Sequence, residues 1–222
     1  MQIKKISGLV LFILSIVISP LISPSKAESQ WERAKSSNMI EVFVRPVPGS
    51  AIKEFRAVTE VQSSMSAILA LLDDTSSYTK WMHRCTEAKL LYEKNIYERI
   101  TYNVTSSPWP VEDRDIAVRS VISQNKKTLA VTIALTGLPG YVPVKPKKVR
   151  IVKLSGYWML EPLGAGRLRV TYRLHSEPGG SVPETLVNSS LVDIPYNTLH
   201  NLRRMVNQSP YKDAKYDEII EK

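Results

Sequence analysis

The sequence predicts an α+β protein in which a curved antiparallel sheet is closed by a long C-terminal helix. Short alternating or apolar runs recur between residues 40 and 176, and turn residues separate them. Strands that follow one another through short turns pair in antiparallel fashion, which argues against a parallel sheet. A long helical pattern then fills 181–206, and such a helix would close the concave side of the sheet.

Residues 1–27 have the three-part layout of a secretory signal peptide. Two lysines at 4–5 precede an apolar run over 9–18, and the small-x-small pattern SKA follows at 25–27. An N-terminal membrane anchor is the alternative, but the apolar run is short for a membrane span. We expect export with cleavage after residue 27, a periplasmic or secreted location, and a single domain over 28–222.

The charge of the chain bears on whether it binds nucleic acid, and its cysteine content bears on whether disulfide bonds stabilise it. The formal net charge is +9, and it falls to +6 without the three lysines of residues 1–27. The basic residues are spread along the chain with no aromatic-rich RNA motif, so no nucleic-acid partner is expected. The single cysteine, Cys85, cannot form an internal disulfide, and we expect a small buried hydrophobe rather than a reactive thiol.

Eight segments have the alternation and residue types that are typical of strands. In order they are 40–47, 51–61, 87–94, 97–104, 115–124, 129–136, 149–162 and 167–176. Asn95 marks a hairpin turn, and LGAG at 163–166 marks a tight one. The Pro-Trp-Pro sequence at 108–110 is expected to form a stiff connection in which Trp109 covers the end of the sheet.

Three segments before residue 86 are predicted to be helical. Residues 28–38 form a short helix, 63–74 form a helix capped by Ser63 or Ser64, and 76–85 continue as a short helix or turn. The apolar stripe of the second segment comprises Met65, Ile68, Leu69 and Leu72.

The two faces of two strands differ in character. The strand over 167–176 alternates cleanly, so one face is expected to be buried and the other wet. Its apolar face comprises Leu168, Val170, Tyr172 and Leu174, and its polar face Arg169, Thr171, Arg173 and His175. In 129–136 one face is apolar, while the other holds only threonine and alanine. Such small residues let a helix approach closely or leave room for a ligand, and helix packing is the favoured interpretation.

The C-terminal segment has the strongest helical pattern. The sequence SVPE at 181–184 fits a capping box with proline in the first turn. Pro195 removes one backbone hydrogen bond inside the helix and should bend it. The apolar stripe comprises Val187, Leu191, Ile194, Leu199, Leu202 and Met205 or Val206.

The sequence lacks the common catalytic and cofactor motifs. The GAG at 164–166 has no phosphate-loop context, no GxSxG elbow is present, and His83, His175 and His200 lack metal-ligand spacing. We therefore expect no cofactor, no metal and no catalytic residues.

An ordered set of motifs resembles the START domain, the steroidogenic-acute-regulatory-protein-related lipid-transfer family. PWPVEDRDIAVRS at 108–120 precedes a proline-rich connection and VRIVKLSGYWMLEP at 149–162. GAGRLRVTYRL and HSEPGGSVPETLVN then lead into the long helix. The resemblance spans about residues 31–207, and it implies a helix-grip fold, a curved antiparallel sheet around a C-terminal helix with an internal hydrophobic cavity.

The resemblance also implies a gate formed by residues 137–148 and the C-terminal helix. Lipid contacts at the gate and tunnel wall are expected from Leu138, Tyr141, Val142, Tyr172, Val187, Leu191 and Ile194. Lys145, Lys147 and Lys148 are expected to touch an anionic membrane surface transiently. An ordinary solvated loop is the alternative for this connection.

A polar anchor for a ligand headgroup is expected inside such a tunnel. Its candidates are Arg114, Arg119, Asp115, Glu98 and Tyr102. A buried ion needs a partner, so the anchor should be a pair of opposite charges. Arg114 and Arg119 are five residues apart and point to opposite faces of an unbroken strand, so at most one faces the cavity.

The leading functional hypothesis is a non-enzymatic protein that binds and transfers a lipid or another hydrophobic ligand. The alternative is a cyclase, aromatase or hydrolase on the same fold, in which Asp113, Asp115 and His175 do acid–base work. A ligand sensor ranks last because no second domain is present to receive a signal. Sterols, phospholipids, fatty acids and isoprenoids all remain open as ligands.

Overall fold

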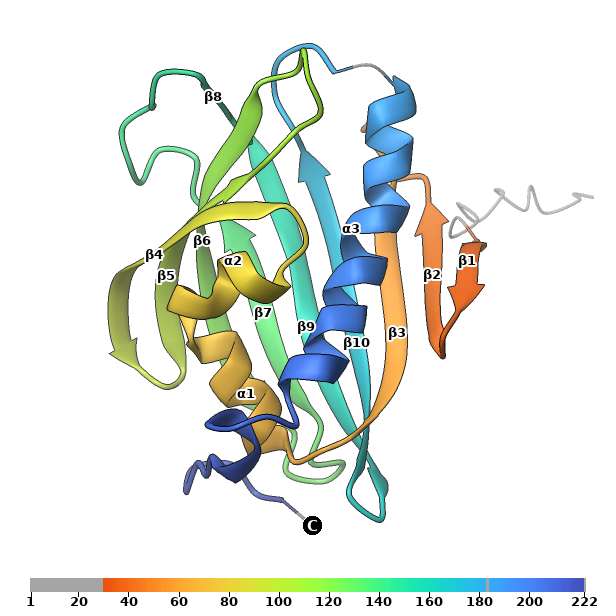
Figure 1. Ribbon diagram of the computed structural model, residues 1–222, viewed down its shortest axis with the longest axis vertical. Helices are drawn as coiled ribbons and strands as arrows, with labels where there is room; N and C mark the ends of the chain where they lie inside the picture. Colours follow the sequence, from red (N-terminus) through yellow and green to blue (C-terminus); the bar gives the residue numbers. More distant parts are fainter. Residues whose placement is uncertain (1–29, 183, 222) are drawn as a thin grey trace, which may run out of the picture.

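A large, mainly antiparallel sheet carries the helices on one of its faces in the computed structural model, which describes residues 30–182 and 184–221 (Figure 1). The expected signal peptide lies outside these residues. The strands are β1 (Glu32–Ser37), β2 (Ile40–Arg45), β3 (Glu54–Gln62), β4 (Cys85–Asn95), β5 (Glu98–Thr105), β6 (Asp113–Gln124), β7 (Val131–Gly137), β8 (Lys148–Arg150), β9 (Lys153–Gly164) and β10 (Arg167–Glu177). The helices are α1 (Met65–Asp73), α2 (Tyr78–Trp81) and α3 (Glu184–Met205), with 3-10 turns at Thr75–Ser77 and Tyr211–Asp213.

The order of strands across the sheet is β1-β2-β3-β10-β9-β7-β6-β5-β4. The last strand, β10, therefore lies inside the sheet and joins the N-terminal strands to the middle of the chain. One pairing departs from the antiparallel prediction, because the predicted strand over 149–162 divides into β8 and β9. Short β8 pairs in parallel with the start of β6 and brings Arg150 opposite Asp115.

The predicted helix over 28–38 is wrong, because residues 32–37 form the edge strand β1. This segment is polar and does not alternate, but it pairs with β2 from Ser37 opposite Ile40 to Glu32 opposite Val44. Asn38 and Met39 turn the chain, and both have positive φ, as a two-residue hairpin turn requires. Pairing with a neighbouring strand overrides the local preference here.

Helices α1 and α3 provide the main packing on the concave face of the sheet. Ser64 caps α1, as predicted, by accepting a hydrogen bond from the backbone N–H of Ala67 at 3.0 Å. The C-terminal half of α3 enters the core, where Leu199 and Leu202 are completely buried, as is Val206 directly after the helix. Pro195 lies inside α3, as predicted. The predicted capping box includes residue 183, which lies outside the described residues.

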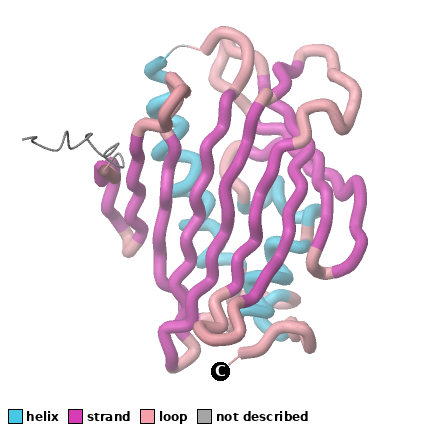
Figure 2. Tube along the Cα trace, turned by 180° about the vertical axis from the view of Figure 1, so that it is seen from behind, coloured by secondary structure: helices cyan, strands magenta, loops and turns pink. Residues whose placement is uncertain are grey.

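No helix of residues 30–182 or 184–221 covers the convex face of the sheet (Figure 2). Ala134 and Thr136 of β7 point outward and are exposed. Both interpretations of this small-residue face are therefore wrong, because it neither receives a helix nor lines the cavity. The predicted wet face of β10 is also only partly wet, since Thr171 and His175 are 4% and 5% exposed.

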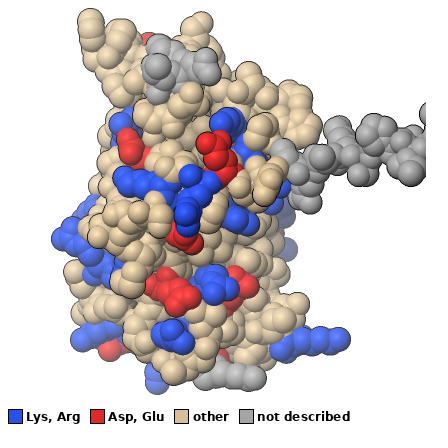
Figure 3. All heavy atoms as spheres, turned by 90° about the vertical axis from the view of Figure 1, so that its right-hand side faces the viewer, with Lys and Arg blue, Asp and Glu red and all other residues tan. Residues whose placement is uncertain are grey.

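Charged side chains of both signs alternate on the side of the molecule that carries β1, β2 and β3 (Figure 3). Glu54 pairs with Arg45 at 2.5 Å and with Arg173 at 2.6 Å. The guanidinium groups of Arg45 and Arg56 lie over the Trp31 ring at 4.6 and 4.7 Å. These arginines are thus held by a carboxylate or by an aromatic ring. Among the described residues, no helix is sufficiently long and apolar to span a bilayer.

The segment after α3, residues 207–221, folds back across α1, and we call it the C-terminal strap. Its Glu221 carboxylate accepts hydrogen bonds from the backbone N–H groups of Met65 and Ser66, both at 2.8 Å. Its Tyr216 hydroxyl donates to Asp73 at the other end of α1. The strap thus fixes both ends of a helix that forms one wall of the cavity described below.

Candidate functional site

A cavity of about 290 Å³ lies between the concave face of the sheet and the helices. The lining side chains come from strands β3, β4, β5, β6, β7, β9 and β10 and from helices α1, α2 and α3. Most of the lining is apolar, with polar side chains at a few positions. This size is at the lower end of the usual range for small-molecule sites.

The alternation of β6 decides which of the predicted anchor residues enter this cavity. Side chains at even positions face inward, namely Arg114, Ile116, Val118, Ser120 and Ile122. Residues at odd positions, which include Asp115 and Arg119, therefore point to the opposite side of the strand. On the paired strand β5 the odd positions Arg99, Thr101, Asn103 and Thr105 line the cavity.

Four of the five predicted anchor residues lie outside the cavity. Arg119 pairs with Glu98 at 2.7 Å on the outer surface, and its side chain is 45% exposed. Asp115 and Tyr102 are buried, but they lie behind β6, where the Tyr102 hydroxyl donates to Asp115 Oδ2 at 2.8 Å. The structure thus places these four side chains on the face of β5 and β6 that points away from the cavity, since neighbouring residues of a strand point to opposite faces.

Asp115 is instead the centre of a structural ion pair. Arg150 donates to both carboxylate oxygens, from Nε to Oδ1 at 2.8 Å and from Nη2 to Oδ2 at 3.0 Å. Burial raises the pKa of Asp115, but hydrogen bonds from Arg150 and Tyr102 lower it by more, so its pKa lies below the usual value. The carboxylate is therefore ionised at neutral pH and compensated by Arg150.

Arg150 also holds the β7–β8 loop, residues 138–147, which forms most of the predicted gate connection over 137–148. Its Nη1 donates to the carbonyl oxygens of Pro139 and Val142, and its Nη2 to that of Pro143 at 3.1 Å. A carboxylate behind the sheet thus fixes this loop through one arginine. The sequence interpretation missed Arg150, because nothing in the order of residues indicates that β8 lies beside β6.

The gate and tunnel-wall residues separate into two groups. Those that line the cavity are Tyr172, Val187, Leu191 and Ile194. Leu138, Tyr141 and Val142 are not among the lining residues, and Tyr141 is 48% exposed. The predicted wall residues of β10 and α3 therefore do line the cavity, whereas those of the β7–β8 loop lie outside its lining.

The three loop lysines differ in their surroundings. Lys145 pairs with Glu87 at 3.1 Å and lies over the Tyr102 ring at 3.9 Å. Lys148 pairs with Asp113 at 3.2 Å. Lys147 is exposed. Two of the three predicted membrane contacts thus already have a carboxylate partner within the protein.

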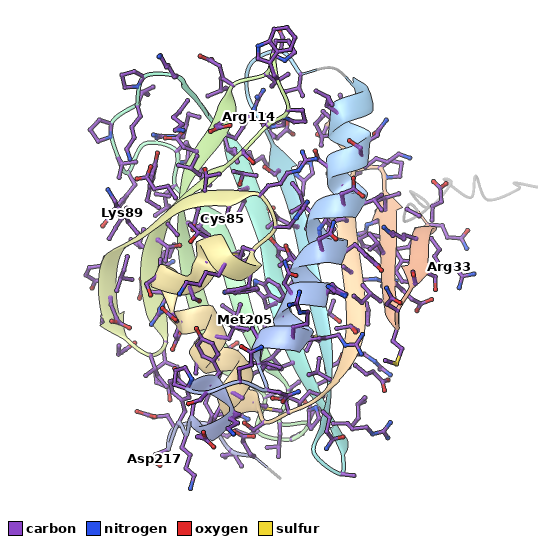
Figure 4. The ribbon with its side chains drawn as sticks, in the orientation of Figure 1. Arg33, Cys85, Lys89, Arg114, Met205 and Asp217 are labelled. Atoms are coloured by element: carbon purple, nitrogen blue, oxygen red, sulfur yellow. The ribbon has the colours of Figure 1, made fainter. Side chains whose placement is uncertain are left out.

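Arg114 is the predicted anchor residue that does face the cavity (Figure 4). The residue is only 6% exposed. Its Nη1 donates to the Glu112 carbonyl oxygen and, at 3.4 Å, to Ser107 Oγ. Its Nε is buried without a hydrogen-bond partner, and no carboxylate of the described residues lies within ion-pair distance. Burial lowers the pKa of Arg114, and Glu112 and Asp113 raise it less.

Arg99, which the sequence interpretation missed, is a second arginine in the cavity wall. It is 7% exposed and forms ion pairs with Asp73 at 3.2 Å and with Glu93 at 2.5 Å. Burial raises the pKa of Asp73, although the Tyr216 hydroxyl and Arg99 act against that rise. The alternation of Arg99 with Thr101 and Asn103 was the available signal, since it marks a face of β5 that is neither apolar nor fully charged.

The apolar part of the cavity wall is built on stacked aromatic rings. Trp158 of β9 and Tyr172 of β10 stack with ring centroids 3.9 Å apart and planes 1° apart. Gly156 lies two residues before Trp158 in the GYW motif, and a Cβ at this position would lie 2.1 Å from the carbonyl oxygen of Arg173. The glycine therefore lets β9 and β10 approach closely beside the stacked pair.

The residues proposed for acid–base chemistry do not converge. Asp113, Asp115 and His175 are absent from the cavity lining. His175 Nε2 lies 3.2 Å from Ser50 Oγ and 3.8 Å from Glu177, on the opposite face of β10 from Leu174. Among the described residues, no group of three His, Cys, Asp or Glu side chains could hold a metal ion.

Cys85 lines the cavity, and the rate at which its thiol is alkylated reports on the burial of that thiol. Burial raises the pKa of its thiol to about 11, although a hydrogen bond with the Glu87 backbone acts against the rise. Because the thiolate is the nucleophile, iodoacetamide should alkylate native Cys85 at pH 8 about 200-fold more slowly than an ordinary thiol of pKa ~8.5. The rate should rise with pH up to about 11.

Mass spectrometry of the alkylated protein against time measures this rate. The same protein in urea is the control, and there Cys85 should react at the ordinary rate. Native alkylation that levels off above pH 9 would contradict the expected burial of the thiol.

Comparison with known proteins identifies consistent relatives. A family model described as the START domain matches residues 23–212. An uncharacterized protein of Pseudomonas aeruginosa is 38% identical over 173 residues, which cover 78% of this chain and 85% of that protein.

Two solved structures have the same fold. The crystal structure of a STAR-related lipid transfer protein from Xanthomonas axonopodis, a fragment of residues 25–204, is 34% identical with a TM-score of 0.74 and covers 80% of this chain and 99% of that one. Human StAR-related lipid transfer protein 5 is 17% identical with a TM-score of 0.72 and covers 83% and 89%. The predicted helix-grip fold is thereby confirmed.

Proposed function

Because the chain belongs to the START domain family, we propose that it binds a lipid or another hydrophobic molecule in the cavity and transfers it between membranes without altering it chemically. The observation that carries the proposal is the apolar cavity between the sheet and α3. The family and the fold support binding of a hydrophobic ligand. We propose in addition that the protein transfers this ligand and that it does not alter the ligand chemically.

Enclosure of the ligand is the proposed mechanism. Each CH₂ group that leaves a bilayer for water costs about 0.8 kcal/mol, so an unprotected lipid moves slowly through water. Side chains such as Ile133, Leu135 and Leu191 provide an apolar surface that replaces the bilayer. The protein then lowers the barrier to transfer by carrying the tail in contact with these side chains.

The N-terminal half of α3 is the proposed gate. Leu186, Val187 and Leu191 line the cavity but are only partly buried, whereas Leu199 and Leu202 in the other half are completely buried. Pro195 separates the two halves and removes one backbone hydrogen bond between them. Outward movement of the first half would expose the cavity while the second half stays packed in the core.

Membrane contact is proposed for the end of the molecule where α3 begins. The loops between β5 and β6 and between β7 and β8 lie at this end (Figure 1). They carry apolar side chains that face water, with Trp109 92% and Val144 73% exposed. The expectation that Trp109 covers the end of the sheet is therefore wrong, and we propose that its ring enters the bilayer interface beside Lys147.

The location proposed for this exchange is outside the cytoplasm, most simply the periplasm. The proposal rests on the sequence pattern of residues 1–27 alone. Fractionation of cells that express the full chain, with N-terminal sequencing of the recovered protein, should find the mature form starting at residue 28.

Lipid retention and transfer test the proposed function. Protein purified from its own source is expected to release a lipid in native mass spectrometry, and the lipid should be recovered chemically unchanged. The protein should also speed lipid movement between vesicles. In a Trp109→Ser variant the rate of transfer should fall several-fold, while the amount of lipid bound stays the same. Protein that neither retains nor moves any lipid would overturn the proposal.

A further inference from the structure

We propose that the C-terminal strap is the floor of the cavity and that it sets the greatest length of hydrophobic tail that the protein accepts. The strap lies at the opposite end of the molecule from the start of α3, where the ligand is proposed to enter (Figure 1). Residues 213–221 of the strap lie beyond the family match, which ends at residue 212. The inference rests on the proposed function and adds a determinant of its specificity.

The cavity ends along β6 where the strap crosses the sheet. Ser120 and Ile122 face inward and line the cavity, and Gln124 is the next residue on the same face of the strand. Gln124 is not among the lining residues, and its amide binds the strap instead. The amide donates to the Ile220 carbonyl oxygen at 2.8 Å and accepts from the Ile220 backbone N–H at 3.0 Å. The strap therefore closes the inner face of the sheet one position beyond the last lining side chain.

The strap also holds the helix that faces this end of the sheet. Leu69, Leu72 and Asp73 of α1 line the cavity. The Glu221 carboxylate binds the first N–H groups of α1, and the Tyr216 hydroxyl donates to Asp73 at 2.5 Å. Because Tyr216 binds a residue of the cavity wall directly, a change in the position of the strap changes the shape of that wall.

Buried apolar side chains make the strap a packed layer and not a solvated tail. Tyr211 and Ile219 are each 6% exposed and belong to the same hydrophobic core as Leu69 and Leu72. A ligand tail that extended past Ile122 would have to displace close-packed side chains, which is unfavourable. The strap thus gives the cavity a fixed end.

A fixed floor implies a limit to the length of the tail. The cavity follows β6 from Arg114, beside the β5–β6 connection, to Ile122 at the floor. At ~3.4 Å per residue this path is roughly 27 Å long. Each CH₂ group that is buried within this length strengthens binding, whereas a group beyond it must force the strap and α1 apart.

Displacement of a fluorescent probe by straight-chain alcohols of increasing length measures this limit. Parinaric methyl ester is the probe, because it is fluorescent and carries no charge. Alcohols from decanol to eicosanol compete with it for the wild-type protein. Their affinity should rise about fourfold with each added CH₂ group up to a limiting length. Beyond that length the affinity should fall about tenfold, because overpacking a closed site is unfavourable.

Glu221→Ala releases the strap from the start of α1 and should move the limit to longer alcohols. The first alcohol beyond the wild-type limit should regain about tenfold in affinity, while the affinity for decanol stays unchanged. The variant should remain folded, because the loss of a helix cap has a modest cost. Glu218→Ala is the matched control, since it removes an exposed glutamate of the same strap for which the described residues provide no hydrogen-bond or ion-pair partner. It should keep the wild-type limit.

Two tyrosines of the strap provide a second matched pair at the other end of α1. Tyr216→Phe removes the hydroxyl that binds Asp73 in the cavity wall, and it should move the limit in the same direction as Glu221→Ala. Tyr211→Phe removes a hydroxyl that donates to Asp74, which is not among the lining residues. This control should keep the wild-type limit, although it loses the same kind of hydrogen bond.

The results separate this inference from the proposed function. If neither the probe nor any alcohol binds, the proposed function fails together with the inference. If the affinity of the wild type rises without a break up to the longest alcohol, the function stands and the cavity has no floor at the strap. If Glu221→Ala and Tyr216→Phe both keep the wild-type limit, or if the two control variants move it equally, the strap does not set the length of the tail.

Discussion

Replacement of Asp115 by alanine is expected to lower the free energy of unfolding by about 3–5 kcal/mol, the usual cost of breaking a buried ion pair. Asp115 is completely buried and is the carboxylate partner of Arg150. The substitution leaves the Arg150 guanidinium without its counter-charge. It also releases the β7–β8 loop, because Arg150 then has no fixed position from which to hold the three loop carbonyls.

Urea denaturation followed by tryptophan fluorescence measures the change. Glu98→Ala is the matched control, because it breaks a carboxylate–arginine pair on the surface with Arg119. That change should cost less than about 1 kcal/mol. Equal losses of stability in Asp115→Ala and Glu98→Ala would show that the buried ion pair does not stabilise the fold.

The same ion pair makes a specific prediction about pH. The pKa of Asp115 in the folded protein lies below its value of about 3.9 in the unfolded chain, so its contribution to stability is present above pH 4. The contribution is lost as the pH falls through the folded-state pKa. The difference in stability between the wild type and Asp115→Asn should therefore shrink below pH 4. Asp73 acts in the opposite direction because its pKa is raised, and the comparison of the two proteins cancels its effect.

Replacement of Ser120 by phenylalanine is expected to weaken binding of a hydrophobic ligand by at least tenfold. Ser120 lines the cavity in the middle of β6, between Val118 and Ile122. A benzyl group at this position fills space that a lipid tail would otherwise occupy, while the apolar surroundings accept the ring without an unpaired polar atom. The dissociation constant of parinaric methyl ester, which lacks the charge, measures the effect of volume alone.

Ser123→Phe provides the matched control, because it makes the same substitution on the outer face of the same strand, where Ser123 is exposed. Its affinity should equal that of the wild type. If Ser120→Phe binds the ester as well as Ser123→Phe does, the ligand does not lie in this cavity.

Elements with a clear period could be predicted from the sequence. The apolar stripe of α3 and the apolar face of β10 each have one arrangement that buries the apolar side chains, so the structure confirms the helix and the inward face of the strand. The segment over 32–37 has no period of its own. Its strand conformation comes from pairing with β2, which no local pattern indicates.

The candidate site was less predictable, because β6 has no purely apolar face. Ile116 and Val118 lie on the cavity side with Arg114, while Ala117 and Val121 lie on the other side with Asp115. Each face of β6 thus holds both apolar and charged residues, so residue types alone do not show which face lines the cavity. The sequence therefore reduced the choice to Arg114 or Arg119, and the packing of the strand against its neighbours was needed to select Arg114.

The position of β10 between β3 and β9 has a consequence for how the chain assembles. Strands β1–β3 and β4–β7 are both complete before residue 138, yet they do not touch in the sheet, because the hairpin of β9 and β10 joins them. Contacts between residues as distant as Gln62 and Arg167 must form before either part has a closed core. Folding should therefore be slow compared with a helical protein of this length. Any fragment that ends before residue 167 should lack independent stability, since its two parts would have no shared strand.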